Sequence, residues 1–262
     1  DGPSFFAKHR RRIGGVVLLL LVGLLLTHGS QVVPSTLRLA LLRCCFHPRS
    51  SMKSRRLAHV SDLHLGRGRV HEERVELLVT ALLEAEIDHV VVTGDLTHRG
   101  RHHELALFHR TFAPLLARDR VTVIPGNHDR LGDDLRDALM PSSRVAVERR
   151  PGLYIVRIDS TAEHNRSWIS GHGKLTAGDV ADVVAALDAA PRHLLAVLLL
   201  HHHVLPLPHD HTVEWLTSRL GWPFCDELPL GPTLLEAVRG RCDLVLHGHR
   251  HTPGTATLFE ED

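Results

Sequence analysis

The sequence predicts an α/β fold in which strands alternate with amphipathic helices. Three short apolar segments, at residues 57–61, 89–93 and 121–124, end in polar loops, and the first two are followed by segments with apolar residues at helical spacing. Repetition of this strand, loop and helix unit predicts a parallel sheet with right-handed crossovers. Hydrophobic residues make up 43% of the 262 residues but aromatic residues only 4%, so we expect one sizeable, aliphatic core.

Two helices are predicted in the first half of the chain. Residues 71–86 have apolar residues on one face and glutamates in the opening turn, where the helix dipole favours negative charge. The apolar positions of this helix are Val75, Leu78, Val79 and Leu82. Those of the second helix are Leu105, Phe108, Phe112 and Leu115. Each helix connects two strands of the predicted sheet.

The second half of the chain contains four more predicted strands and two helices. Thr176 is a suitable N-cap for the longer helix, in which apolar residues recur between positions 180 and 187. A proline-rich segment with Trp215 and Trp222 follows residue 203 and is expected to form loops. The predicted strands are residues 153–158, 194–200, 243–247 and 254–259, and the shorter helix is residues 233–239.

Charge is distributed unevenly along the chain. Residues 1–56 hold ten Lys or Arg and one Asp, which leaves 21 of the 31 basic and 29 of the 30 acidic residues from Leu57 onward. The folded part is therefore acidic, which argues against general nucleic-acid binding, because such binding requires a basic face. Four cysteines without a Cys-x-x-Cys pair argue against a disulfide framework or a cysteine zinc site.

The N-terminal segment allows two interpretations. Basic residues within 8–12 precede an apolar run at residues 13–26, as in signal peptides and anchors, and the run is short for a full membrane span. If the run anchors the chain in a membrane, the basic flank stays in the cytoplasm and the folded domain lies outside. If Met52 is the native start, residues 1–51 are not native and the protein is cytoplasmic. We expect a basic tail and linker over residues 1–56 and a folded domain over residues 57–262.

Polar side chains suited to metal binding follow five of the predicted strands. Because the chain contains 23 histidines, a histidine pair at ligand spacing carries weight only beside carboxylates at a strand end. If the sheet is parallel, the carboxyl ends of its strands meet at one edge and these side chains converge. The strand-end residues are Asp62 and His64, Asp95, Asn127 and His128, His201 to His203, and His249 and His251.

This set of residues suits transition metals. Imidazole, carboxylate and amide ligands without thiolate favour Mn, Fe or Zn over Mg or Ca. The candidate ligands outnumber those that one ion takes from a protein, whereas two ions about 3.5 to 4 Å apart, bridged by one carboxylate, would use them all. The sequence therefore predicts a centre with two divalent metal ions.

The order of these motifs resembles the calcineurin-like metallophosphoesterase superfamily. The chain has Asp-x-His at 62–64, Gly-Asp at 94–95, Gly-Asn-His-Asp at 126–129, a strand-end histidine at 201–203 and Gly-His-x-His at 248–251. Within the superfamily, it is most similar to the bacterial cyclic-nucleotide phosphodiesterase branch. The resemblance covers residues 57–257 and implies a four-layer α/β/β/α sandwich, with two mostly parallel or mixed sheets flanked by helices.

The resemblance also implies a role for each strand-end residue. One metal ion would be bound by Asp62, His64 and His251. The other would be bound by Asn127, His249 and one histidine of residues 201–203, and Asp95 would bridge the two ions. In the family, this last histidine is usually followed after one residue by proline. Because Val204 stands at that place, His202 is the first choice and His201 the alternative.

The activity that the resemblance implies is phosphoester hydrolysis by a hydroxide that bridges two metal ions. His128 is expected to protonate the leaving oxygen or to hold a phosphoryl oxygen, since imidazole can carry a proton near neutral pH. The expected substrate is a small-molecule phosphodiester, with cyclic nucleotides included. A phosphomonoesterase, a lipid-linked pyrophosphate hydrolase or a nuclease would use the same centre. A non-catalytic scaffold and a histidine-rich metal-storage protein are alternatives of other classes.

The chain departs from the family in two places. His98 stands where the Gly-Asp motif often continues to a second acidic residue, so the contacts around the metal ligands are expected to differ. The family usually continues with further strands after Gly-His-x-His, so the domain is expected to be truncated at Asp262. A homodimer is compatible with this interpretation. Substrate specificity is expected to reside in the loops between His203 and Thr233.

Overall fold

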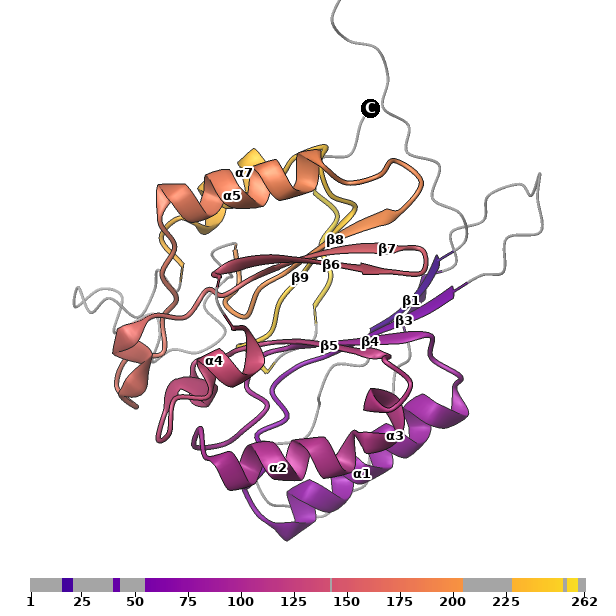
Figure 1. Ribbon diagram of the computed structural model, residues 1–262, viewed down its shortest axis with the longest axis vertical. Coiled ribbons are helices and arrows are strands. Elements are labelled where there is room, and N and C mark those ends of the chain that lie inside the picture. Colours follow the sequence, from indigo (N-terminus) through magenta and orange to yellow (C-terminus); the bar gives the residue numbers. More distant parts are fainter. Residues whose placement is uncertain are drawn as a thin grey trace, which may run out of the picture.

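The fold consists of two β-sheets packed face to face between two layers of helices (Figure 1). The computed structural model describes residues 16–20, 40–42, 55–141, 143–204, 228–251 and 254–258, and of residues 16–20 and 40–42 it describes only the backbone. The α/β/β/α sandwich expected from the sequence is confirmed. Most of the loop region expected to set specificity, including Trp215 and Trp222, lies outside the described residues.

Five strands form the first sheet, in the order β2-β1-β3-β4-β5. β3 (Arg55–Val60), β4 (His89–Thr93) and β5 (Val121–Ile124) are parallel neighbours, as predicted. β1 (Val16–Leu20) pairs with β3 in parallel, and β2 (Ala40–Leu42) pairs with β1 in antiparallel orientation. Part of the apolar run at residues 13–26 thus forms a strand. Among the described residues, no helix is long and apolar enough to cross a membrane.

The second sheet has the order β6-β7-β8-β9. β7 (Leu153–Ile158), β8 (Leu195–Leu199) and β9 (Leu244–Leu246) are parallel and match three predicted strands. β6 (Val145–Arg150) pairs with β7 in antiparallel orientation and was not predicted, because this edge strand is half polar. The strand predicted at residues 254–259 is wrong for residues 254–258, which are exposed and pair with no described strand.

Helices cover the outer face of each sheet (Figure 1). α1 (Arg69–Glu84), α2 (His102–Thr111) and α3 (Ala113–Leu116) lie on the first sheet, and α5 (Ala177–Asp188) and α7 (Gly231–Ala237) lie on the second. The single helix predicted from Leu105 to Leu115 is divided between α2 and α3, where Pro114 lacks an N–H group for the helical ladder. α4 (Arg136–Leu139) and two 3-10 helices (His128–Arg130 and Glu163–Arg166) lie in loops.

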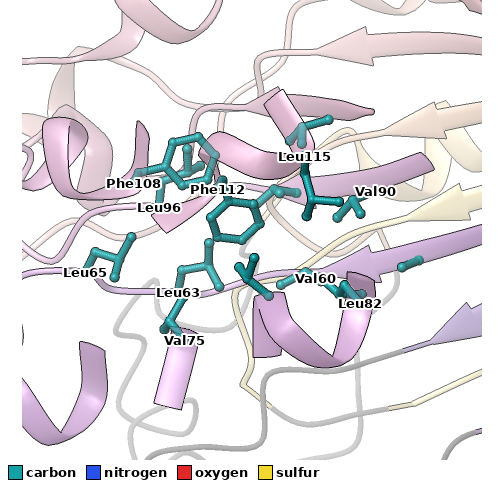
Figure 2. Close-up of a cluster of buried hydrophobic side chains, with 14 of the residues drawn as sticks. Val60, Leu63, Leu65, Val75, Leu82, Val90, Leu96, Phe108, Phe112 and Leu115 are labelled. Carbon is teal, nitrogen blue, oxygen red and sulfur yellow. The ribbon is translucent and has the colours of Figure 1, made fainter. Parts of the chain in front are cut away.

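Three apolar layers hold the sandwich together. Side chains alternate along each strand, so Val91 of β4 faces the other sheet whereas Val90 and Val92 face the helices. Figure 2 shows the layer between the first sheet and its helices, in which the rings of Phe108 and Phe112 lie 4.6 Å apart. A second apolar layer fills the space between the sheets, and a third joins the second sheet to α5 and α7. The strand ends that carry the site are therefore fixed by packing on both faces.

A buried hydrogen-bond chain also joins the two sheets. The Nε2–H of His89 donates to the hydroxyl of Thr122 at 2.7 Å, and that hydroxyl donates to the carboxylate of Glu148 on β6 at 2.8 Å. Burial, together with the smaller effect of the positive charge of Arg150, lowers the pKa of His89 from 6.5 to about 4. His89 is therefore neutral in the folded protein at neutral pH.

The buried His89 should make the protein less stable in acid. Its folded pKa lies below its unfolded value, so its contribution to stability is complete above pH 6.5 and is lost as the pH falls toward 4. From pH 7.5 to pH 5, this loss amounts to about 2 kcal/mol. Glutamine takes up no proton in this range. In urea denaturation, the free energy of unfolding of His89→Gln should therefore fall by about 2 kcal/mol less than that of the wild type between pH 7.5 and pH 5.

The matched control is His103→Gln, at an exposed position of α2, which should follow the wild type at both pH values. The prediction fails if His89→Gln loses as much stability on acidification as the wild type does.

Candidate metal centre

The carboxyl ends of five strands, three in the first sheet and two in the second, meet at one end of the sandwich. Two hydrogen bonds join the sheets there. The Nδ1–H of His201, after β8, donates to the Thr93 carbonyl at 2.7 Å, and the N–H of His249, after β9, donates to the Asp62 carboxylate at 3.0 Å. The strand-end residues therefore converge between two sheets, and not at the edge of a single parallel sheet.

The loops that carry the candidate ligands have an unusual backbone. Five of these residues have a positive φ, in the left-handed region that costs a non-glycine residue roughly 1 to 3 kcal/mol. They are Asp62 (58°), His64 (43°), Asp95 (52°), His249 (76°) and His251 (53°). Such strain persists only where the surrounding structure imposes it, and it is typical of functional sites.

Glycines bring two of these loops into contact. Gly94 has a φ of 91°, and a Cβ atom there would collide with Nδ1 of His201 and with Cα of Gly126. A Cβ atom on Gly126 would overlap the carboxylate and the N–H group of Asp95. Only glycine therefore allows the ends of β4, β5 and β8 to approach this closely.

Asp62, His64, Asp95 and His251 form a first ligand group. Each places a ligand atom within 4.8 Å of those of the other three. The Nε2 atoms of His64 and His251 are 3.1 Å apart, and Nε2 of His251 lies 3.4 Å from Oδ1 of Asp62. Oδ2 of Asp95 lies 3.8 Å from Nε2 of His64. Two carboxylates and two imidazoles thus converge on one point.

Asn127, His201 and His249 form a second ligand group. Oδ1 of Asn127 lies 3.0 Å from both Nε2 of His201 and Nδ1 of His249, and these two nitrogens are 3.2 Å apart. Oδ1 of Asp95 lies 3.5 Å from Nε2 of His201. Asp95 therefore faces both groups, one oxygen toward each, as expected of a bridging ligand.

The hydrogen bonds distinguish His201 from His202. The Nδ1–H of His201 donates to the Thr93 carbonyl, which leaves Nε2 to face the second ligand group. In His202, Nε2–H donates to the Gly171 carbonyl at 2.8 Å, and Nδ1 lies 2.8 Å from the Ser160 hydroxyl. That hydroxyl accepts from two backbone N–H groups and so donates its own hydrogen to His202. His201, His202 and His249 each place a ligand atom within 4.8 Å of those of the other two, but because both ring nitrogens of His202 are engaged, the geometry favours His201 over His202, the first choice from the sequence.

The donor atoms of both groups fit metal ions. Oδ1 of Asn127 is a hydrogen-bond acceptor 3.0 Å from Nε2 of His201, so in a largely buried site a proton or a metal ion must lie between the two atoms. Burial alone would lower the pKa of His201, but the carboxylates of Asp95 and Asp62 raise it, and a metal ion would take the place of that proton. Ligand atoms that each lie about 2.1 Å from one metal ion, at right angles, are about 3 Å apart. The spacing of the nitrogen and oxygen atoms thus suits transition-metal coordination.

Burial makes the charges of the site costly without a cation. It raises the pKa of Asp95, and it lowers the pKa of His64 well below the usual value, an effect to which the neighbouring His128 adds. For Asp62, burial acts to raise the pKa, but the hydrogen bond from His251 holds it below the usual range. His64 is therefore neutral, as a metal ligand must be, and bound cations would offset the buried carboxylates.

Comparison with known sequences identifies the family. The sequence model described as calcineurin-like phosphoesterase matches residues 55–253, which is more than half of the chain. The chain belongs to the calcineurin-like phosphoesterase family. Members of this family are dimetal-dependent phosphoester hydrolases, in agreement with two ligand groups that share Asp95. No curated protein matches the sequence.

Two solved structures are similar to this phosphoesterase-family chain. A dimetal phosphatase from Danio rerio is 14% identical, with a TM-score of 0.43, and the match covers 71% of this chain and 76% of that one. A phosphopantetheinyl hydrolase from Mycobacterium tuberculosis is 17% identical, with a TM-score of 0.44, and the match covers 78% of this chain and 85% of that one.

His128 of this phosphoesterase-family site lies beside the first ligand group. Its backbone N–H donates to Oδ1 of Asp95 at 2.8 Å, and its Nδ1–H donates to the backbone carbonyl of His98 at 2.8 Å. Its ring centre lies 4.5 Å from that of His64. Because Nδ1 is occupied, Nε2 is the ring atom that remains for contact with a substrate.

Asp129 holds two loops of the phosphoesterase centre together. Its fully buried carboxylate accepts hydrogen bonds from the N–H groups of Leu96, Thr97 and Gly126 and from the Thr97 hydroxyl. These bonds join the loop after β4 to the loop after β5. This role of Asp129 is not among those predicted from the sequence, although its place at the end of the Gly-Asn-His-Asp motif was the available signal.

Replacing Asp129 by asparagine should destabilise the protein by about 3 kcal/mol, because the amide nitrogen would face backbone N–H donors in a buried site. Urea denaturation of metal-free protein measures this loss directly. Asp137→Asn, whose side chain is 83% exposed, is the control and should change stability by no more than about 0.5 kcal/mol. Equal stabilities of the two variants would show that Asp129 does not hold the loops.

Proposed function

We propose that the protein hydrolyses phosphodiesters, cyclic nucleotides among them, at a binuclear metal centre. The observation that carries this proposal is the pair of convergent ligand groups, which share the buried carboxylate of Asp95. Family membership supports phosphoester hydrolysis as the reaction. The position of His128 fits phosphoester hydrolysis, since an acid beside the first ligand group can protonate the leaving oxygen.

The proposed ligands follow from the distances in the two groups. Asp62, His64 and His251 would hold one ion, and Asn127, His201 and His249 the other, with Asp95 between them. Two divalent ions at these positions would supply Lewis-acid activation of water and of the phosphoryl group. The choice among Mn, Fe and Zn rests on the mixture of imidazole, carboxylate and amide donors.

The residues around the ligands have separate tasks. The Thr93 carbonyl fixes the ring of His201 so that Nε2 points into the site. The His98 carbonyl fixes the ring of His128 in the same way, so the proton on Nε2 of the imidazolium can be delivered to the leaving oxygen. Asp129 and Gly126 keep the two loops in register, so that the distance between acid and ligands is held constant.

A substrate panel with metal-stripped and Mn-loaded protein tests the proposed function. The panel contains cAMP, cGMP, 2′,3′-cyclic nucleotides, bis-p-nitrophenyl phosphate, p-nitrophenyl phosphate and a lipid pyrophosphate. We expect two ions per chain by elemental analysis and metal-dependent hydrolysis of diesters, with Asp95→Asn as the inactive control. Preference for the monoester or the lipid pyrophosphate would redirect the substrate assignment. Two bound ions with no hydrolysis of any compound would favour a non-catalytic scaffold.

A further inference from the structure

A pair of large apolar side chains is exposed beside the metal centre. Trp168 is 60% and Ile169 is 78% exposed, and both lie in the loop of residues 163–172, between β7 and α5. Single exposed apolar residues are ordinary on protein surfaces. Two in succession, next to the presumed acid, are better explained by contact with a ligand.

The loop that presents Trp168 is well ordered by its own hydrogen bonds. Asn165 is buried, and its amide nitrogen donates to the carbonyls of Ser170 at 2.8 Å and His172 at 3.0 Å, while its amide oxygen accepts the N–H of Ala162 at 2.7 Å. The ring of His164 donates to the same carbonyl of His172 at 2.7 Å. The two ends of the loop are thus closed on each other, so the position of Trp168 is set before any ligand binds.

Two contacts place this loop over the metal centre. The carbonyl of Gly171 accepts the Nε2–H of His202, and a Cβ atom at Gly171 would lie 3.7 Å from both Nδ2 of Asn127 and Cε1 of His249. His202 therefore anchors the loop beside the second ligand group. This contact of His202 could not be predicted from the sequence, because Gly171 lies 31 residues away.

At the other side of the loop, Trp168 reaches the presumed acid. Its ring centre lies 5.3 Å from that of His128, nearly perpendicular at 89°, and 5.9 Å from that of His98 at 69°. The rings of His98 and His128 are roughly parallel, 5.9 Å apart. The indole therefore extends the wall of the site on the side where the proton of His128 would be delivered, and most of its surface remains accessible.

We propose that Trp168 binds the leaving group of the substrate and selects one that carries a planar aromatic ring, such as a nucleoside or an aryl alcohol. This inference rests on the proposed function, because it places the phosphoryl group at the two ligand groups and the leaving oxygen at His128. The indole offers a large apolar face beside that oxygen. Among ligands of the same charge, an aromatic ring gains more binding free energy from contact with this face than an alkyl group does. Ile169 adds apolar surface beside the indole.

The test compares two anions with the same phosphonate group, phenylphosphonate and methylphosphonate, in calorimetric titrations of Mn-loaded protein. The wild type should bind the phenyl compound about tenfold more tightly than the methyl compound. Trp168→Ala should abolish most of this preference while binding methylphosphonate as the wild type does, and Trp168→Phe should retain it. Leu77→Ala, at a 69% exposed position of α1, is the matched surface control and should keep the full preference.

Each outcome of the titrations separates the two proposals. If the wild type binds both phosphonates equally, or if Trp168→Ala keeps the phenyl preference, the role of Trp168 is wrong while the phosphoesterase function stands. If neither phosphonate binds to metal-loaded wild type, the proposed function fails and the inference fails with it. Unchanged methylphosphonate binding by Trp168→Ala also shows that this variant is folded.

Discussion

Replacing His201 by alanine is expected to remove one of two metal ions and to reduce phosphodiester hydrolysis more than about a thousandfold. Changing a group that only orients a metal ligand typically costs about 10- to 100-fold, so the loss expected here is larger. The reason is geometric. Nε2 of His201 lies 3.0 Å from Oδ1 of Asn127, 3.2 Å from Nδ1 of His249 and 3.5 Å from Oδ1 of Asp95, so its loss would open the second ligand group. Elemental analysis after exhaustive dialysis measures the metal content, and the initial rate with bis-p-nitrophenyl phosphate measures the activity.

The adjacent His202→Ala variant is the matched control. Both ring nitrogens of His202 are engaged, by Ser160 and by Gly171, so this variant should retain two ions. Its activity should fall by at most about a hundredfold, through displacement of the loop that carries Gly171. A His202→Ala protein that loses one ion, beside a His201→Ala protein that keeps both, would restore His202 as the ligand.

Replacing His128 by alanine should lower turnover by roughly a hundred- to ten-thousandfold, the usual contribution of a general acid, without loss of metal. His128 is not among the assigned ligands, although its ring lies with those of His64 and His98 in a further group of potential ligands, and the backbone N–H that donates to Asp95 survives the substitution. Metal content and turnover number are measured as for His201. His103→Ala, at an exposed position of α2, should resemble the wild type in both.

The leaving group distinguishes the two roles open to His128. If it delivers a proton, His128→Ala should lose more activity on phenyl esters than on p-nitrophenyl esters, because p-nitrophenolate departs without protonation. If it holds a phosphoryl oxygen, both esters should lose activity equally. Normal turnover of both esters by His128→Ala would remove His128 from the mechanism.

Local patterns in the sequence were sufficient for most of the strands. β4, β5 and β7 have the predicted bounds, and β3 and β8 differ from prediction by a residue or two at their ends. These strands are buried on both faces and therefore appear as continuous apolar runs. β6 is an edge strand whose second half, residues 148–150, is charged, and residues 254–258 have apolar character without a partner strand. Both errors arise because pairing depends on neighbours that are distant in the sequence.

In the candidate metal centre, too, local sequence patterns placed some residues, whereas contacts between distant segments decided the rest. The motif order placed Asp62, Asp95 and Asn127 after β3, β4 and β5, since each lies within three residues of the end of an apolar run. The choice between His201 and His202 as a ligand could not be made in this way, because both residues follow β8 and both are fully buried. It depends on whether Thr93, Ser160 or Gly171 occupies a ring nitrogen, and these partners lie between 31 and 108 residues away.

By itself, the sequence determined the types and order of the candidate ligands and the strands that carry them, because apolar periodicity and strand-ending loops are local properties of the chain. The tertiary structure alone decided that two sheets supply the ligands, that Nε2 of His201 faces Asn127, and that the loop of residues 163–172 brings Trp168 to His128. These features depend on hydrogen bonds and ring contacts between segments that only folding brings together.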